Sequence, residues 1–141
     1  MLKLIRARRK NGEKGQALVE FTLLLPIFLL LLFAIIDFGM GFYSWITVTN
    51  SAREGARLGV VMATAQEIED RVYQTADLPN ESTKMTVTVT NAQGQPGESV
   101  VVKVDYDYDL ITPLAGIVSF FSGNVLGPTL TFSSTAEMRL E

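Results

Sequence analysis

The feature that most constrains this chain is an uncharged apolar run near its N-terminus, "FTLLLPIFLLLLFAII" from Phe21 to Ile36. Beyond the acid Asp37, a second uncharged stretch continues from Phe38 to Ala52. A helix of roughly 20 residues crosses the hydrocarbon core of a bilayer, and Phe21 to Ile46 supplies that length with one acid inside it. We therefore predict one membrane-spanning helix and assign it residues 16–46.

Charge is divided unevenly around this run. Residues 1–15 carry a net charge of +5, so the overall charge of −3 leaves −8 for the remainder. Positively charged flanks stay on the cytoplasmic side of a membrane. We therefore expect residues 1–15 to be a basic leader in the cytoplasm and residues 47–141 to be an extracytoplasmic domain. Cationic clusters also occur in nucleic-acid-binding arms, but the position directly before a spanning helix favours topology, and we expect no nucleic-acid partner.

The composition excludes several kinds of chemistry. The chain has no Cys, so disulfides and thiolate chemistry are absent. It has no His, and therefore lacks the usual general base and the usual metal ligand. Its acids, serines and lysines form no recognisable acid–base or nucleophile motif. We expect a protein that is not an enzyme and that has no cofactor.

A secretory signal peptide is another interpretation of a basic start followed by apolar residues. The run is longer than a usual signal-peptide core, lacks a clear small-x-small exit and continues into a sequence compatible with a helix. An uncleaved anchor that tethers a domain stays open on this pattern.

Helical spacing continues beyond the apolar run, where small residues recur at steps of three or four. These are Ala52, Ala56, Gly59 and Ala63. Gly55 and Gly59 also form a G-x-x-x-G pair, surrounded by charged residues that place it outside the bilayer core. We expect the pair to let the helix lie tightly against a sheet or a neighbouring subunit. A kink or break near Gly55 to Gly59 is the alternative.

The rest of the chain predicts a short helix and three strands. "TAQEIEDRVYQTA" fits an amphipathic helix with Thr64 as its N-cap and Glu67 three residues on. From Lys84 the apolar period changes to two, in "MTVTVT", "VVVKVDYDYD" and "LTFSSTAEMRL". An antiparallel three-stranded sheet with one apolar face needs a cover, which the long helix can provide. The apolar segment between the last two strands should form a helix or loop packed over the domain, with Phe120 and Phe121 as anchors.

Three aspartates, Asp105, Asp107 and Asp109, share one face of the middle strand at a spacing of about 7 Å. Carboxylates bind hard cations such as calcium, but a strand spaces them too widely for one ion unless a loop closes around it. We expect a solvated acidic face and no metal, with a cation site as the alternative.

Two acids flank the apolar run. A carboxylate near a helix centre costs about 2.5–3.5 kcal/mol on insertion scales. Glu20 lies near the cytoplasmic end, and Asp37 lies about 25 Å further along the helix at 1.5 Å per residue. Both can therefore reach a membrane interface, and position alone gives neither acid a function.

The spacing of Glu20 is more specific. It is the fifth residue after Gly15, and glycine, four residues, glutamate and then an apolar helix resembles the cleavage site of type IV pilin-like precursors. With "TNSAREGARLG" at Thr49 to Gly59, residues 15–59 resemble the TadE-like pseudopilins of tight-adherence (Flp-type) pilus systems. The ending "STAEMRLE" fits the family more loosely. The family motif falls on Asp37, Asn50, Arg53, Glu54, Gly55 and Arg57.

The resemblance implies that a membrane-embedded prepilin peptidase cleaves between Gly15 and Gln16 and leaves a free amine at Gln16. This new cation and the Glu20 anion can neutralise each other, within one helix end or between subunits. By analogy with related pilins, we favour pairing between subunits, where it would set their register. Pro26 removes one helix hydrogen bond and permits a kink, or is a tolerated bend in a spanning helix.

Together these expectations describe a minor pilin or pseudopilin of the α+β class. A long N-terminal transmembrane helix continues into a pilin-like head that has a second short helix and a three-stranded antiparallel sheet. The protein should lie in the inner (cytoplasmic) membrane and help to assemble or prime a Flp-type pilus. Its expected partners are the prepilin peptidase, other pilin subunits with the assembly machinery, and membrane lipid. The alternatives are an uncleaved tethered domain whose sheet face or 91–99 loop binds an external ligand and, third, a membrane-anchored enzyme.

Overall fold

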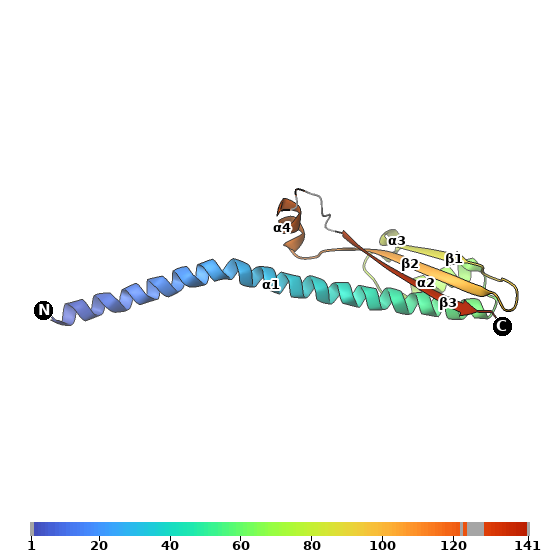
Figure 1. The fold of residues 1–141 in the computed structure, drawn as a ribbon, viewed down its shortest axis with the longest axis horizontal. Helices are drawn as coiled ribbons and strands as arrows, with labels where there is room; N and C mark the ends of the chain where they lie inside the picture. The colour runs from blue at the N-terminus through green and yellow to red at the C-terminus, as the bar shows by residue number, and fades with distance from the viewer. Residues whose placement is uncertain (1, 122, 124–128, 141) are drawn as a thin grey trace. The chain divides into compact units, whose positions relative to one another are not determined.

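The computed structural model describes residues 2–121, 123 and 129–140, and the side chains of those from residue 15 onward. Its elements are α1 (Leu2–Val60), α2 (Ala65–Thr75), α3 (Glu81–Lys84), β1 (Met85–Thr90), β2 (Ser99–Asp109), α4 (Leu114–Phe121) and β3 (Thr129–Arg139), as Figure 1 shows. The long apolar helix, the short second helix and the three-stranded antiparallel sheet confirm the α+β class.

The chain divides into two compact units, Met1–Ile36 and Asp37–Glu141. The first unit is the N-terminal part of α1, whose large apolar side chains are exposed, among them Leu18, Phe21 and Leu23. One helix segment in the described part of the chain, Gly15–Val60, is long and apolar enough to cross a membrane, and its most apolar window is not buried in the protein. A core helix of a soluble protein buries its apolar stripe, so this helix fits a single-pass membrane anchor.

The second unit, which we call the head, contains the sheet. The strand order is β1-β2-β3, and both pairs are antiparallel. Because side chains alternate across a strand, β2 presents one apolar face, which is buried along its whole length. The residues of that face are Val100, Val102, Val104, Tyr106 and Tyr108.

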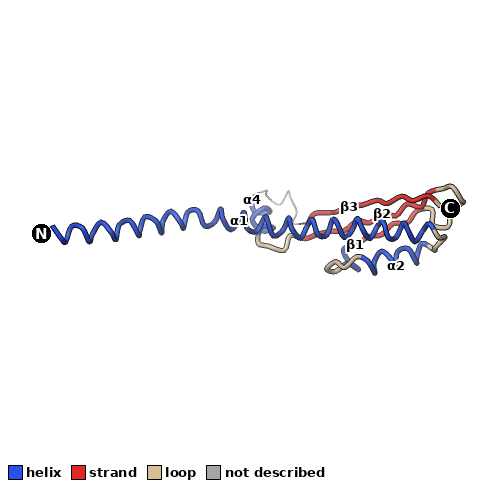
Figure 2. Tube along the Cα trace, turned by 90° about the horizontal axis from the view of Figure 1, so that it is seen from below, coloured by secondary structure: helices blue, strands red, loops and turns tan. Residues whose placement is uncertain are grey.

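The head's part of α1 and the shorter helix α2 lie side by side over this face (Figures 1 and 2). From α1, Val48, Ala52 and Ala56 are completely buried, and from α2, Ile68 and Val72 are. The small-residue stripe predicted from the sequence is thus the contact surface of α1.

The two glycines of the G-x-x-x-G pair, Gly55 and Gly59, make this contact possible. A Cβ added at Gly55 would lie 2.5 Å from Cγ2 of Val72, and one added at Gly59 would lie 2.9 Å from Cγ2 of Val100. Helix α1 runs through both positions to Val60. The glycines therefore permit close approach to α2 and the sheet. The helix does not break at them, and a kink there stays a prediction.

Helix α2 begins with the predicted cap. The hydroxyl of Thr64 accepts a hydrogen bond from the Glu67 N–H, and the Glu67 carboxylate accepts one from the Thr64 N–H at 2.8 Å. This reciprocal pair satisfies two N–H groups at the helix start. The Thr64 hydroxyl also lies within hydrogen-bond distance of the Glu67 carboxylate, at 2.9 Å. Hydrogen bonds from the Thr64 N–H and hydroxyl to the carboxylate lower the pKa of Glu67.

The head, taken as the second compact unit, begins within the segment 16–46 that is expected to span the membrane. Asp37, Gly41 and Ser44 of that segment are buried within the head. The face of α1 that covers the sheet thus begins directly after the apolar run that ends at Ile36.

The expectation for Phe120 and Phe121 is wrong. The segment does form a helix, α4, but the two rings are 81% and 82% exposed and pack mainly on each other, edge to face with centroids 5.5 Å apart. The smaller side chains Leu114 and Val118 face the head instead.

Candidate functional site

The expected processing segment lies in α1. Gly15 is exposed, and nothing lies within 4 Å of where its Cβ would be. The side-chain amide of the next residue, Gln16, donates a hydrogen bond of 3.0 Å to the carboxylate of Glu20, one turn further along the helix. The helix therefore brings residue 16 and the acid to one face, because residues four apart are neighbours on a helix. Glu20 itself is exposed and has no ion pair with the described side chains.

Pro26 lies inside α1, which is helical on both sides of it. The proline lacks an N–H, so the carbonyl of Thr22 loses its usual helix donor. Separately, the Thr22 hydroxyl donates a hydrogen bond to the Leu18 carbonyl, one turn earlier, at 2.8 Å. The kink at Pro26 stays a prediction.

Asp37 is the most highly connected of the expected site residues. Its side chain is 2% exposed, and its Oδ1 accepts hydrogen bonds from the Ile111 N–H at 3.0 Å and the Thr112 N–H at 3.2 Å. Its Oδ2 accepts one from the Thr112 hydroxyl at 2.5 Å. Three donors from the segment between β2 and α4 thus satisfy the buried carboxylate. Without such partners its burial would be very costly.

Two further bonds extend this cluster. The Tyr108 hydroxyl donates to the backbone carbonyl of Asp37 at 3.3 Å, and the Leu114 N–H donates to the Thr112 hydroxyl at 3.2 Å. Burial, together with the nearby Asp37 carboxylate, raises the pKa of Tyr108, so the phenol remains a donor. Asp37 therefore fastens the end of β2 and the start of α4 to α1.

Sequence reasoning placed Asp37 at a membrane interface and missed this role. The signal that can be found in the sequence is Thr112-Pro113 directly before an apolar helix. Threonine is a common N-cap and proline is common at the first helical position. The pattern locates the start of α4, but not the carboxylate that its cap contacts.

The remaining motif residues divide between packing and surface. Gly55 is buried, whereas Asn50, Arg53 and Arg57 are exposed and Glu54 is half-buried. The Glu54 carboxylate lies 4.0 Å from Arg57 and 3.9 Å from Arg71 of α2. Exposed pairs at such distances contribute little to stability, about 0–1 kcal/mol.

Beside these side chains is a shallow hollow of about 160 Å³, lined by Trp45, Ile46, Thr49, Asn50 and Arg53. Within the described residues, Asn50 and Arg53 have no hydrogen bond or ion pair through their side chains. The exposed part of the motif thus offers a cation and an amide on the outer face of α1.

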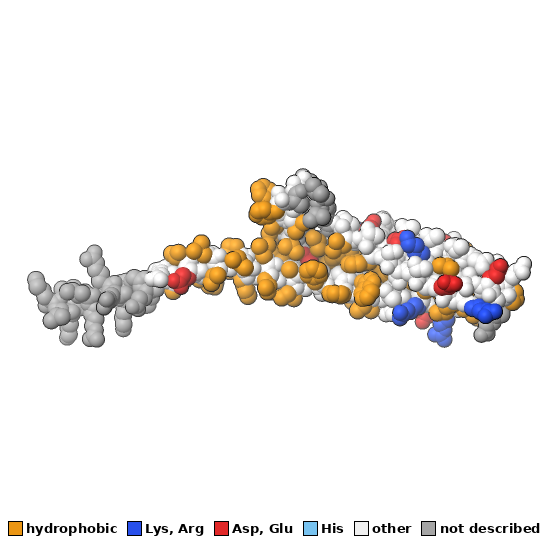
Figure 3. All heavy atoms as spheres, in the orientation of Figure 1, with side chains coloured by type: hydrophobic (Ala, Val, Ile, Leu, Met, Phe, Trp, Pro, Cys, Tyr) orange, Lys and Arg blue, Asp and Glu red, His pale blue; other side chains and the backbone are white. Residues whose placement is uncertain are grey.

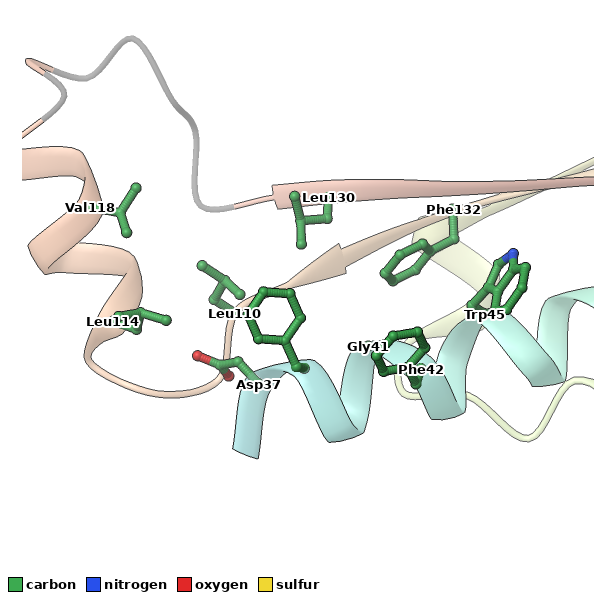
Figure 4. Close-up of a pocket in the computed structure, with 10 residues that line it drawn as sticks. Asp37, Gly41, Phe42, Trp45, Leu110, Leu114, Val118, Leu130 and Phe132 are labelled. Atoms are coloured by element: carbon green, nitrogen blue, oxygen red, sulfur yellow. The ribbon is translucent and has the colours of Figure 1, made fainter. Parts of the chain in front are cut away.

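A larger groove lies at the end of the head where α1 begins its contact with the sheet (Figure 4). It has a volume of about 500 Å³ and is lined almost entirely by apolar atoms. Its walls come from α1, α4 and the first half of β3. The residues are Asp37, Phe38, Gly41, Phe42, Trp45, Leu110, Leu114, Val118, Leu130 and Phe132.

The acidic face of β2 is a hydrogen-bonded ladder. Asp105, Asp107 and Asp109 each accept a hydrogen bond from the hydroxyl directly opposite on β3. Lysines add ion pairs at the two ends, Lys103 with Asp105 at 2.8 Å and Lys84 with Asp109 at 2.7 Å. In the part of the chain that the structure describes, no group of three or more acids is placed to hold one metal ion.

These contacts change the acidity of the two end carboxylates. Hydrogen bonds from Lys103 and Ser133 lower the pKa of Asp105, and those from Lys84 and Thr129 lower the pKa of Asp109. The same bond to Asp109 raises the pKa of Lys84. The ladder is thus a set of pairs between strands, with its charges partly neutralised locally.

Comparison with known proteins identifies one family. The family model described as TadE-like protein matches residues 15–57, which contain Gly15, Glu20, Asp37 and the motif of α1. No curated protein and no solved structure matches the chain. The family match confirms the resemblance found in the sequence and indicates a Tad pilus-associated protein.

Proposed function

Because residues 15–57 are TadE-like, we propose that the protein is a minor pilin or pseudopilin of a Flp-type pilus. A prepilin peptidase removes residues 1–15 by hydrolysing the bond between Gly15 and Gln16. The mature subunit is held in the inner membrane by α1, with the head outside the cytoplasm, until it joins or primes the filament. The role is non-enzymatic.

The observation that carries this proposal is the family match over a helix that serves two purposes. Its first part is apolar and exposed, as a membrane segment must be, and its second part forms the core of the head through Val48, Ala52 and Ala56. One helix, α1, therefore contributes residues both to the apolar segment and to the core of the head. The basic residues 1–15 support a cytoplasmic N-terminus, since positive flanks are retained there.

Glu20 is the proposed assembly residue. It is exposed, lies in an apolar surface and bonds only to the neutral Gln16 amide among the described side chains. Cleavage would create an ammonium group at Gln16, which can pair with Glu20 of the same or an adjacent subunit. An ion pair in an apolar bundle is costly to break by removing one partner, about 3–5 kcal/mol. Such a pair would select one register between subunits.

The decisive experiment compares the mature N-terminus in cells with and without the peptidase. Mass spectrometry should find a chain that begins at Gln16 only when the peptidase is present. Gly15→Leu should block processing, while Gly12→Leu, in the leader and outside the proposed bond, should leave it intact. A chain that still begins at Met1 in both cells contradicts the proposal and favours an uncleaved, tethered domain.

The Glu20 step is tested separately. Glu20→Gln keeps the hydrogen bond to Gln16 and removes the charge, so the variant should be processed normally and yet form few pili. Thr22→Val, also on the exposed surface of α1, is the matched control. Normal piliation with Glu20→Gln would exclude charge pairing, without affecting the proposal on cleavage.

A further inference from the structure

We propose that α4, with the apolar groove beside it, binds membrane lipid and rests in the bilayer surface on the side of the head. This inference rests on the proposed membrane anchoring by α1, but not on cleavage or on pilus assembly.

Helix α4 exposes an unusual amount of apolar surface. Phe120 and Phe121 are 81% and 82% exposed, and Ile111, just before the helix, is 61% exposed. No charged residue occurs between Asp109 and Glu137 in the sequence. Contiguous apolar patches on a protein surface mark contacts with a membrane or another protein.

Hydrogen bonds hold the start of α4 beside Asp37 of α1. Asp37, which immediately follows the apolar run Phe21–Ile36 in the chain, binds Ile111 and Thr112 through its carboxylate. Helix α4 begins two residues later, at Leu114, whose N–H bonds to Thr112. If α1 spans the bilayer with its apolar run, α4 therefore starts where the chain leaves the hydrocarbon.

Aromatic side chains surround the same level of α1. Phe38, Phe42, Tyr43 and Trp45 are between 48% and 64% exposed. They follow Asp37 within eight residues, or about 12 Å of helix. Aromatic residues, Trp and Tyr above all, gather at the boundary between lipid and water, so this part of α1 suits the depth that we infer for α4.

The groove fits an acyl chain better than a polar ligand. It is lined almost entirely by apolar atoms, and the Asp37 carboxylate in its wall already accepts three hydrogen bonds from the protein. Figure 4 shows Leu114 and Val118 of α4, Leu130 and Phe132 of β3, and Phe42 and Trp45 of α1 around it. In Figure 3, hydrophobic side chains are seen on α4, whereas charged side chains are spread along the rest of the head.

Lipid is the partner that we favour for α4 and the groove, because the proposed anchoring of α1 already brings the chain into contact with a bilayer. A second copy of the chain would have to be recruited to cover α4, whereas lipid already surrounds the residue preceding Asp37. Interfacial helices usually carry Lys or Arg toward anionic lipid, and α4 carries none. We therefore expect binding by partition of apolar side chains, with little dependence on salt or on anionic lipid.

The chain contains a single tryptophan, Trp45, which permits a direct test on the full-length protein in phosphatidylcholine vesicles. Trp45→Phe combined with Phe120→Trp moves the only fluorophore to α4. Trp45→Phe with Gln95→Trp moves it to the exposed loop 91–98, as the control. Lipid brominated on the acyl chains near the glycerol should quench the emission of the Phe120→Trp protein and blue-shift it, and leave that of the Gln95→Trp protein unchanged.

A charge in the patch should reverse the effect. Phe121→Asp added to the α4 reporter should reduce quenching, while Val61→Asp should not, although Val61 is also an exposed apolar residue of the head, at 71%. Both positions are exposed, so the fold should tolerate the change.

Flotation of the same vesicles separates the possible outcomes. If every variant floats and the α4 reporter is quenched, lipid binding is supported. If every variant floats but the α4 reporter is unquenched, α1 anchors the chain and the inference is overturned. Emission that is blue-shifted, unquenched and dependent on protein density in the membrane would also overturn it, since another copy would then cover α4. A chain that does not float contradicts the anchoring itself.

Discussion

The hydroxyl of Thr112 donates a hydrogen bond of 2.5 Å to Oδ2 of Asp37, although 75 residues separate the two in the chain. With the N–H groups of Ile111 and Thr112, it closes the N-terminal end of the head around a buried carboxylate. Contacts of this kind join α1 to elements far away in the sequence.

Replacing Asp37 with Ala should loosen the start of α4. The change leaves two buried N–H groups and a hydroxyl without an acceptor, at about 1–3 kcal/mol for each unsatisfied group. Asp37→Asn retains one carbonyl acceptor and should cost less. Hydrogen exchange of the Ile111 and Thr112 amides, in the full chain in micelles, measures the effect. Equal protection in Asp37→Ala and the parent would show that these bonds do not hold the segment.

Gly55→Ala should destabilise the head even though alanine favours helix. The new Cβ would lie 2.5 Å from Val72, which is fully buried and cannot move aside. Overpacking of this type costs about 1–3 kcal/mol. Gly39→Ala is the matched control in the same helix, because its Cβ meets nothing within 4 Å, and it should be neutral or gain up to about 1 kcal/mol. Thermal unfolding of both variants in micelles checks the prediction, and similar Tm values would refute it.

Acid should weaken the sheet through the ladder between β2 and β3. The pKa values of Asp105 and Asp109 are lowered from their ordinary 3.8 in the folded head, so the unfolded chain binds more protons than the folded one in that range. Their contribution is present above about pH 4 and is lost as the pH falls through the lowered values. The Tm should therefore fall on acidification, and less steeply in Asp105→Asn/Asp109→Asn. A double variant with the unchanged acid slope would assign the loss to other groups.

Thr64→Ala should shorten or fray α2. It removes the hydroxyl that accepts from the Glu67 N–H, and loss of an N-cap costs about 1 kcal/mol. Thr49→Ala removes a hydroxyl that bonds only to a carbonyl within its own helix, and should have little effect. Amide exchange in the first turn of α2 distinguishes the two. An unprotected first turn in the parent would contradict a role for the capping box.

Much of the fold could be predicted because it depends on local periodicity. The alternation in β2 identified its buried face, and steps of three or four in α1 identified the stripe that covers it. The capping box of Thr64 and Glu67 is likewise a pattern of near neighbours. For β2 and α1, burial of a regular apolar set determines which face points inward.

The long-range polar contacts could not be predicted in this way. Pairing of Asp107 with Thr131 depends on the register between β2 and β3, which the alternation of each strand leaves open by steps of two residues. The role of Asp37 depends on where the segment after β2 turns back. The outward direction of Phe120 and Phe121 depends on which side of α4 meets the head, and hydrophobicity alone suggested the wrong side.

The processing and assembly residues form a third class. The roles proposed for Gly15, Gln16 and Glu20 involve an enzyme or other subunits, so they come from motif spacing and remain predictions. The roles of Asn50 and Arg53, the exposed part of the motif, likewise remain predictions. Gly55 and Asp37, in contrast, are accounted for by buried contacts inside the head.

The central place of β2 sets an order of events during synthesis. The stripe on α1 has no surface to cover until β2 has emerged from the ribosome, and β2 gains its second neighbour only when β3 follows. Leu140, 2% exposed and bonded through its N–H to the Glu98 carbonyl at 2.7 Å, is among the last residues to join the core. Contacts between such distant segments form slowly. The apolar N-terminal segment is therefore complete long before the head can close, and a nascent chain has time to be targeted while its C-terminal half is still unfolded.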